Sequence, residues 1–483
     1  MRPLFRGLLK SPGDFLTSAQ RATHTYVVGQ PGTGKSRALE SWVMQDIAAG
    51  RGAGVIDPHG DLFRNLLLRL SSKPETWERV VVLDPCNQKW TVSFNPLEAV
   101  SDFSQERLAV FLTDVMVKIW KLNMAGSPRL IWLLTNSFLA LANLGLTLVD
   151  LPRFLLDRPF RESLLPRLAN EGARAYFLFE FPKSRGAVHQ WITPVLNKIG
   201  GLIFDPDLRL MLAGGSKLSF RAVLDRRLIL LVNLPKGILG EGTSALLGAF
   251  IVAHLQKAAL SRANIKRRIP YYLYLDEFQN YTTDNIKDIL SESRKYALSL
   301  TMAHQYLDQL SPDLRSAVLN TTGTLVCFRV GYHDARQLVY EIFPSPDFLA
   351  TLETRFKFSR IGSLPFLAVE ERQKALRWEG LAQVLTKLPS RQFWCRQRGT
   401  YTPVKRRTLD MPDPIITPKI RSMKLELLDV SGRQFGRLKQ AVRREFGSGR
   451  FHFVDESAGD CPKSGSIPEK QSPERGDVPL WSD

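Results

Sequence analysis

The sequence predicts an α/β protein with a mainly parallel sheet, an inserted all-α subdomain and a disordered C-terminal tail. Three observations support this prediction. Short apolar runs alternate with helical patterns in two parts of the chain, which favours a parallel sheet with right-handed crossovers. The stretch between those parts has amphipathic helical patterns and few strand runs. The last residues are rich in Ser, Pro, Gly and charge, a composition typical of disorder.

The length of 483 residues exceeds one ordinary domain, so we expect several units. These are a basic leader (1–23), the first part of the core (24–100), the all-α insert (101–222), the second part of the core (223–410) and a largely disordered tail (411–483) with one basic helix at 433–446.

The composition favours a polyanionic partner. A net charge of +19 and a pI near 9.9 are typical of proteins that bind nucleic acid or an anionic membrane surface, although scattered surface charge remains an alternative. The four cysteines, Cys86, Cys327, Cys395 and Cys461, form no C-x-x-C pair. Their spacing argues against a zinc site or a disulfide scaffold and fits a reducing cytosol.

Residues 130–149 form an uncharged run of 20 residues, long enough to cross a bilayer. The run contains two Asn, one Ser and two Thr, and polar groups are costly in lipid. It also lies between the glycine-rich segment 29–36 and the acidic pair at 276–277, which are expected to meet in one site. We therefore expect a buried helix pair, and no membrane span of the chain's own.

The first motif fits the phosphate-binding loop G-x-x-x-x-G-K-[ST] at every fixed position, between an apolar strand at 24–28 and a helix at 37–49. Its residues are Gly29, Gln30, Pro31, Gly32, Thr33, Gly34, Lys35 and Ser36. Glycines let backbone N–H groups surround a polyphosphate, and the helix N-terminus adds positive potential. Lys35 should reach the β- and γ-phosphates, and the Ser36 hydroxyl should ligate Mg²⁺.

Two further strands, at 53–57 and 79–83, end in Asp57 and Asp84. Ligands of parallel sheets bind beyond the carboxyl ends of the strands, where Gly29 also falls. We therefore expect Asp57 to help bind the nucleotide.

The strand at 271–275 is followed by Asp276 and Glu277, a Walker B pattern. Alone this pattern is weak, because apolar strands often end in an acid. Downstream of an intact phosphate-binding loop it predicts that Asp276 holds Mg²⁺ and that Glu277 orients and deprotonates the attacking water. Glu277 thus favours hydrolysis over nucleotide binding alone.

Three more residues are catalytic candidates. Gln305 follows the next strand, where an amide can contact both water and γ-phosphate; an ordinary loop amide is the alternative. A ring-shaped motor also needs an arginine from the neighbouring subunit, which can contribute ~10³–10⁵ in rate. Arg329 and Arg336 are candidates, and surface salt bridges are the alternative for each.

The segments DPHGD (57–61), LDEFQNY (275–281) and SESRKYALSLTMAHQYLDQL (291–310) resemble conjugative coupling ATPases of type IV secretion, the TraG/TraD type within the FtsK–HerA group of DNA-pumping motors. Residues 278–280 are similar to the TraM-recognition region of that family. The resemblance covers residues 24–400. By position, Lys35, Ser36, Asp276, Glu277 and Gln305 match the nucleotide-site motifs of the family.

The resemblance implies a RecA-like core, ATP and Mg²⁺ as cofactors, and a homo-hexamer that threads DNA of any sequence through a central channel. It also implies relaxosome or type IV secretion components as partners. Members usually carry transmembrane helices before the loop, whereas 28 residues precede Gly29 here. We expect a cytoplasmic protein that associates with the inner membrane through partners.

Two alternatives of different classes remain. A DNA or relaxosome receptor module would bind nucleotide for assembly without pumping. Another P-loop enzyme, a GTPase or transporter ATPase, is disfavoured because N-K-x-D and L-S-G-G-Q are missing from the sequence. The basic clusters 266–268 and 405–407 are candidate DNA contacts, with solvated loops as the alternative.

Overall fold

The computed structural model describes residues 17–98, 104–122, 126–281, 290, 293–343, 366–399 and 403–445. The outer parts of the expected leader and tail, residues 1–16 and 446–483, lie outside this range. Within it, nine strands form one sheet in the order β10-β9-β8-β1-β7-β6-β2-β5-β3, and β4 pairs with β11 in a second sheet.

Seven neighbouring strands of the described sheet run parallel, which confirms the prediction of a mainly parallel α/β fold. They are β1 (Thr25–Val28), β2 (Gly52–Asp57), β3 (Val80–Leu83), β5 (Ile229–Asn233), β6 (Tyr271–Leu275), β7 (Leu298–His304) and β8 (Thr324–Cys327). At one edge, β9 (Gln392–Gln397) and β10 (Val404–Arg407) are antiparallel. The small second sheet is formed by β4 (Trp90–Thr91) and β11 (Arg437–Leu438).

Helices cover both faces of the sheet. The side chains of a strand alternate between faces, so one strand contributes to the apolar core on each side. Val27 packs in one apolar cluster with α3 (Lys35–Ala48) and α4 (Asp61–Ser71), whereas Tyr26 and Val28 pack in the other. The second cluster contains α14 (Glu241–Leu260). Among the described helices, α14 alone is long and apolar enough to cross a membrane, and 89% of its apolar window is buried inside the protein.

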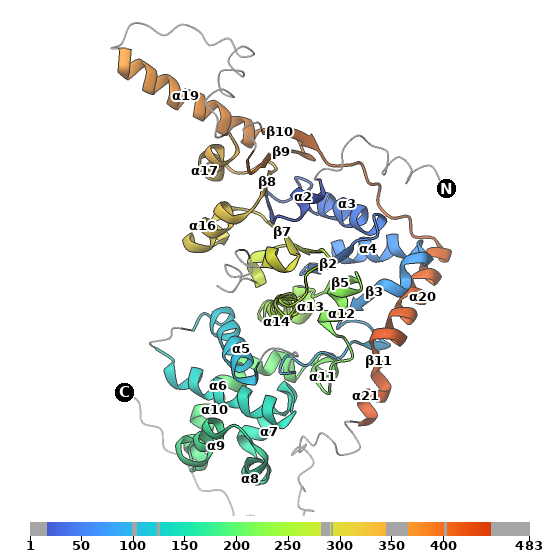
Figure 1. Ribbon diagram of the computed structural model, residues 1–483, viewed down its shortest axis with the longest axis vertical. Coiled ribbons are helices and arrows are strands. Elements are labelled where there is room, and N and C mark those ends of the chain that lie inside the picture. The colour runs from blue at the N-terminus through green and yellow to red at the C-terminus, as the bar shows by residue number, and fades with distance from the viewer. Residues whose placement is uncertain are drawn as a thin grey trace, which may run out of the picture.

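The described residues between β4 and β5 form helices and no strand, as expected of the insert. The helices are α5 (Gln105–Ile119), α6 (Pro128–Leu144), α7 (Leu151–Leu156), α8 (Arg158–Leu164), α9 (Glu171–Ala175), α10 (Arg185–Ile203), α11 (Pro206–Leu212) and α12 (Phe220–Asp225). In Figure 1, α5 to α11 gather at one end of the molecule, below the sheet.

The run at 130–149 is divided between α6 and a short 3-10 turn, η2 (Leu148–Asp150). Gly145, with φ +70°, ends α6 in the left-handed conformation. Leu133, Leu134 and Phe138 of α6 are buried within the apolar core.

The remaining helices flank the core. They are α2 (Ser18–Arg21), α13 (Lys236–Leu239), α16 (Pro312–Thr321), α17 (Tyr332–Ile342) and α19 (Phe366–Thr386), with the short η1 (Pro74–Arg79), η3 (Leu165–Arg167), η4 (Tyr176–Glu180), η5 (Phe278–Tyr281), η6 (Ser293–Tyr296) and η7 (Leu307–Gln309).

Residues 411–445 differ from the expected disordered tail. They contain α20 (Pro418–Phe435), β11 and α21 (Lys439–Glu445), so the basic helix expected at 433–446 is instead the end of α20, a strand and α21. The Thr417 hydroxyl caps α20, and Leu427 is buried against the core. The backbone N–H of Val82 donates to Ser431 Oγ at 2.9 Å, which fixes α20 along β3 at the far edge of the sheet (Figure 1).

Candidate functional site

The phosphate-binding loop joins β1 to α3 at the carboxyl end of the sheet. Gly32 and Gly34 have φ of +73° and +107°, conformations that side-chain-bearing residues rarely adopt. Gly29 is required for a different reason, because a Cβ there would lie 2.5 Å from Cβ of Phe328. Gly29 and Gly34 are thus needed at the two glycine positions that the motif fixes, and Gly32 is needed at a variable position.

The Lys35 amine lies over this loop. It donates to the backbone carbonyl of Gly29 and, at 3.1 Å, to that of Gln30. Burial lowers the pKa of Lys35, and the nearby carboxylates of Glu277 and Asp276 partly offset this effect. Lys35 is thus close to both acids of the Walker B strand.

Ser36 and Asp276 lie together although they are far apart in the sequence. The Ser36 hydroxyl is 3.4 Å from Oδ2 of Asp276. Burial, together with the charges of Asp57 and Glu277, raises the pKa of Asp276 to about 7, and Lys35 opposes the shift. A hydroxyl and a carboxylate at this spacing fit Mg²⁺, which binds few protein oxygens and otherwise keeps water and phosphate ligands. Among the described residues, no group of three or more His, Cys, Asp or Glu side chains could hold a metal ion by itself.

Glu277 follows directly and is held by two amides. Gln305 Nε2 donates to Oε1 at 2.8 Å, and Gln279 Nε2 donates to Oε2 at 2.7 Å. The backbone of Glu277 has φ +46°, an unfavourable conformation for a residue with a side chain, and such strain often occurs at functional sites. Gln305 therefore lies at the Glu277 carboxylate, and its contact with water and γ-phosphate stays a prediction. Gln279 was not a candidate from the sequence.

Asp57 is fully buried beside this group, but both of its oxygens are engaged. They accept hydrogen bonds from the backbone N–H groups of His59 (2.8 Å) and Phe63 (2.9 Å). Asp57 therefore orders the turn into α4 and raises the pKa of Asp276. Direct contact of Asp57 with a nucleotide stays a prediction.

The two arginine candidates lie differently. The backbone carbonyl of Arg329 accepts from Gln30 N–H at 2.8 Å, so Arg329 supports the phosphate-binding loop of its own chain. The Arg329 side chain is half-buried. Arg336 is exposed on α17. Which arginine, if either, completes a neighbouring site stays a prediction.

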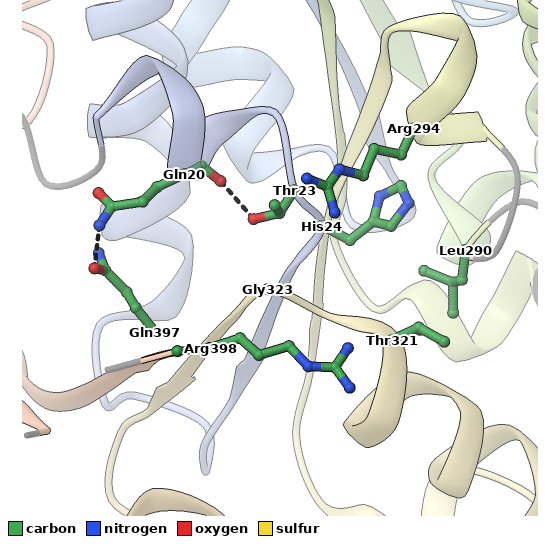
Figure 2. A pocket seen from close by; sticks show the side chains of 10 residues that line it. Gln20, Thr23, His24, Leu290, Arg294, Thr321, Gly323, Gln397 and Arg398 are labelled. Carbon is green, nitrogen blue, oxygen red and sulfur yellow. Dashed lines mark hydrogen bonds between the residues drawn. The ribbon is translucent and has the colours of Figure 1, made fainter. Parts of the chain in front are cut away.

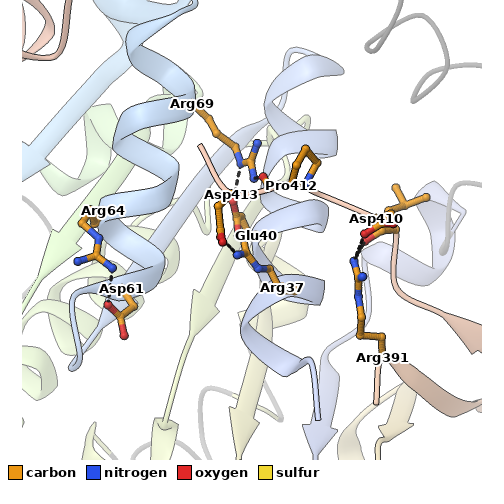
Figure 3. Close-up of polar contacts among 10 residues, drawn as sticks. Arg37, Glu40, Asp61, Arg64, Arg69, Arg391, Asp410, Pro412 and Asp413 are labelled. Carbon is orange, nitrogen blue, oxygen red and sulfur yellow. Dashed lines mark hydrogen bonds and ion pairs between the residues drawn. The ribbon is translucent and has the colours of Figure 1, made fainter. Parts of the chain in front are cut away.

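Arg391 also contacts the loop, and no motif in the sequence indicated this contact. Its N–H donates to the Thr33 carbonyl at 2.7 Å, and its φ is +70°. Figure 3 shows its guanidinium on Asp410 (2.6 Å), where the chain leaves β10.

The crossing segment, residues 408–414, then runs past α3 and α4. Arg37 of α3 contacts Asp413, and Arg69 of α4 donates to the Pro412 carbonyl at 2.6 Å (Figure 3). Both arginines also contact the buried carboxylate of Glu40. The C-terminal part of the chain is thereby attached to the helix that follows the phosphate-binding loop.

Solved structures with a similar fold include conjugative coupling proteins. The unbound monoclinic form of the bacterial conjugative coupling protein TrwBdeltaN70 has a TM-score of 0.58 at 17% identity, with 83% of this chain and 88% of that chain covered. Plasmid coupling protein TrwB in complex with ADP and Mg²⁺ has a TM-score of 0.56 at 18% identity, with 83% and 89% covered.

A third structure, VirB4 of Thermoanaerobacter pseudethanolicus, has a TM-score of 0.50 at 12% identity, with 84% of this chain and 92% of that chain covered. No protein-family model matches the sequence, and the comparison with curated proteins gives no match. At these identities the likeness shows the fold, which agrees with the RecA-like core implied by the sequence motifs.

Proposed function

We propose that the chain is an Mg²⁺-dependent ATPase that translocates DNA, with or without bound protein, as part of a conjugative coupling machine. The observation that carries this proposal is the meeting of Ser36, Asp276, Glu277 and Gln305 at one end of the sheet. Similarity of fold to coupling proteins, one of them in complex with ADP and Mg²⁺, supports the choice of reaction and cofactors.

The residues divide the work by their positions. Backbone N–H groups of the loop and the Lys35 amine would bind the phosphates, and Ser36 and Asp276 would hold Mg²⁺. When bound, the ion neutralises charge that develops on the phosphates. Glu277 accepts the proton of the attacking water, and the Gln305 amide, already 2.8 Å from Glu277, orients that water. Such a pair supports hydrolysis rather than binding alone.

The proposed partners are DNA of any sequence, five further copies of the chain in a ring, and relaxosome or secretion components at the inner membrane. The net charge of +19 supports a phosphate-backbone partner.

The two basic clusters, 266–268 and 405–407, differ in whether their side chains are available to contact DNA. Arg268 donates to the carbonyls of Arg262, Ala263 and Lys295, which gives it a structural role. Residues 405–407 are exposed on the edge strand β10 and remain candidate DNA contacts.

The test is an ATPase assay with and without DNA over a range of salt, on wild type, Lys35→Ala and Glu277→Gln. Wild type should hydrolyse ATP faster with DNA, and both variants should turn over near background. Glu277→Gln should still bind ATP, because the loop is unchanged. Glu162→Gln on the surface of α8 is a matched control and should behave as wild type.

Two outcomes would contradict the proposal. Wild-type turnover that DNA does not raise at any salt would favour the receptor module over the motor. A strict monomer at high protein concentration with ATP would contradict the ring.

A further inference from the structure

A cavity of about 540 Å³ lies at the opposite end of the sheet from the phosphate-binding loop. Its wall includes His24, which precedes β1, and Gly323, which precedes β8, so it lies where these parallel strands begin. Figure 2 shows Arg294 and Arg398 on its walls with His24. Neither the phosphate-binding loop nor the Walker B acids line this cavity.

The His24 ring is buried behind the wall of this cavity. The backbone N–H of Leu300 donates to Nδ1 at 3.0 Å, so in the neutral ring the proton is on Nε2. Nε2 is buried and has no hydrogen-bond partner among the described residues. Because it is buried, the ring forms part of the wall and does not reach a ligand in the cavity.

Burial and the charge of Arg294 lower the pKa of His24 to about 4. The backbone of Leu290 on the same wall opposes this shift. The ring is therefore neutral at pH 7 and adds no charge to the cavity.

Two exposed arginines, Arg294 and Arg398, bring positive charge to the cavity. Arg294 lies on η6, and Arg398 follows β9, where its backbone N–H donates to the Gly323 carbonyl at 2.8 Å. Within the described part of the chain neither guanidinium has a carboxylate partner, and no Asp or Glu lines the cavity. Two guanidinium groups are a donor set that matches the oxygens of a phosphate group.

We infer that this cavity is a second anion site that binds a phosphate group. Its volume falls in the range of small-molecule pockets, roughly 300–1,000 Å³, so a free pyrophosphate or nucleotide phosphate fits. A backbone phosphate of DNA offers the same oxygens. The inference does not depend on ATP hydrolysis, because none of its residues belongs to the proposed catalytic group.

The experiment is calorimetric titration of inorganic pyrophosphate into Lys35→Ala protein, in which the phosphate-binding loop is impaired. Arg294→Gln and Arg398→Gln, each added to that background, should weaken affinity by about tenfold, because each removes a charge-assisted hydrogen bond. Arg167→Gln and Arg185→Gln, at exposed arginines of the insert, are matched controls that should leave affinity within about twofold. Thermal melts verify that each variant is folded.

Competition with a short unlabelled oligonucleotide then identifies the source of the phosphate. Displacement of pyrophosphate supports DNA as the ligand, and no displacement supports a free phosphate compound. Absence of pyrophosphate binding in the Lys35→Ala protein overturns the inference. Unchanged binding when Arg294→Gln and Arg398→Gln are combined in that protein also overturns it. ATPase activity is measured separately, so failure of the motor proposal would appear as lost turnover with pyrophosphate binding intact.

Discussion

Replacement of Asp276 by Asn should stabilise the free protein while it removes magnesium binding. Asp276 is buried beside two other carboxylates, and its pKa is raised from 3.8 to about 7. The folded protein therefore holds a proton that the unfolded chain releases. A shift of about 3 pH units at ~1.36 kcal/mol each corresponds to about 4 kcal/mol against folding at neutral pH.

The sign of the effect follows from the two pKa values. Below about pH 4 both states are protonated, and the carboxyl group has no effect on stability. Between pH 4 and pH 7 the unfolded state ionises while the folded state does not, so wild-type stability falls as pH rises. Above about pH 7 the difference is constant. Asn does not titrate and can still accept the N–H of Glu277 at Oδ1.

The assay is thermal unfolding from pH 4 to pH 8.5 without nucleotide. For a chain of this length the entropy of unfolding is about 1 kcal/mol per kelvin, so Asp276→Asn should melt about 4 °C above wild type at pH 8 and no higher at pH 4. Asp61→Asn, at an exposed carboxylate paired with Arg64, is the control and should shift little. Mg²⁺ with ATP should then raise the midpoints of wild type and Asp61→Asn but not that of Asp276→Asn. Equal midpoints at pH 8 would refute the reasoning.

Three further predictions test the surroundings of the site. Glu40→Ala leaves Arg37 and Arg69 without their buried carboxylate and should cost about 3–5 kcal/mol, measured as a lower unfolding midpoint. Gly29→Ala should abolish nucleotide binding in an equilibrium titration, since its Cβ would clash with Phe328. Gln279→Ala should lower kcat by about tenfold through the lost hydrogen bond to Glu277, and Gln305→Ala should lower it further because Gln305 also meets the water.

The strands and the phosphate-binding loop were predictable because local patterns determine them. The strand at 271–275 is observed at those residues, and the glycines occupy the positions where the backbone needs them. The pairing of Ser36 with Asp276 followed from one rule, that the carboxyl ends of parallel strands share an edge.

Contacts made by packing were not predictable in this way. Arg391 reaches Thr33 only because an antiparallel strand is added beside β8, and no local pattern in the sequence indicates that pairing. The prolines at 412 and 414 favoured a tail, yet the chain crosses α3 and forms α20, whose capping Thr417 followed by Pro418 was a usable signal. The engagement of both Asp57 oxygens depended on the turn at 58–60, which the strand pattern does not specify.

Two strands connect the ends of the sheet that we assign to phosphate chemistry. β1 begins after His24 and ends at the phosphate-binding loop, and β7 begins just after the η6 turn of Arg294 and ends before Gln305. Spatial continuity alone does not establish coupling, which requires that occupancy of one site change affinity at the other. Such coupling is reciprocal, so pyrophosphate in the cavity and nucleotide at the loop would change each other's affinity by the same factor. Equal affinities with and without the second ligand would instead mean that the rigid sheet holds two independent sites.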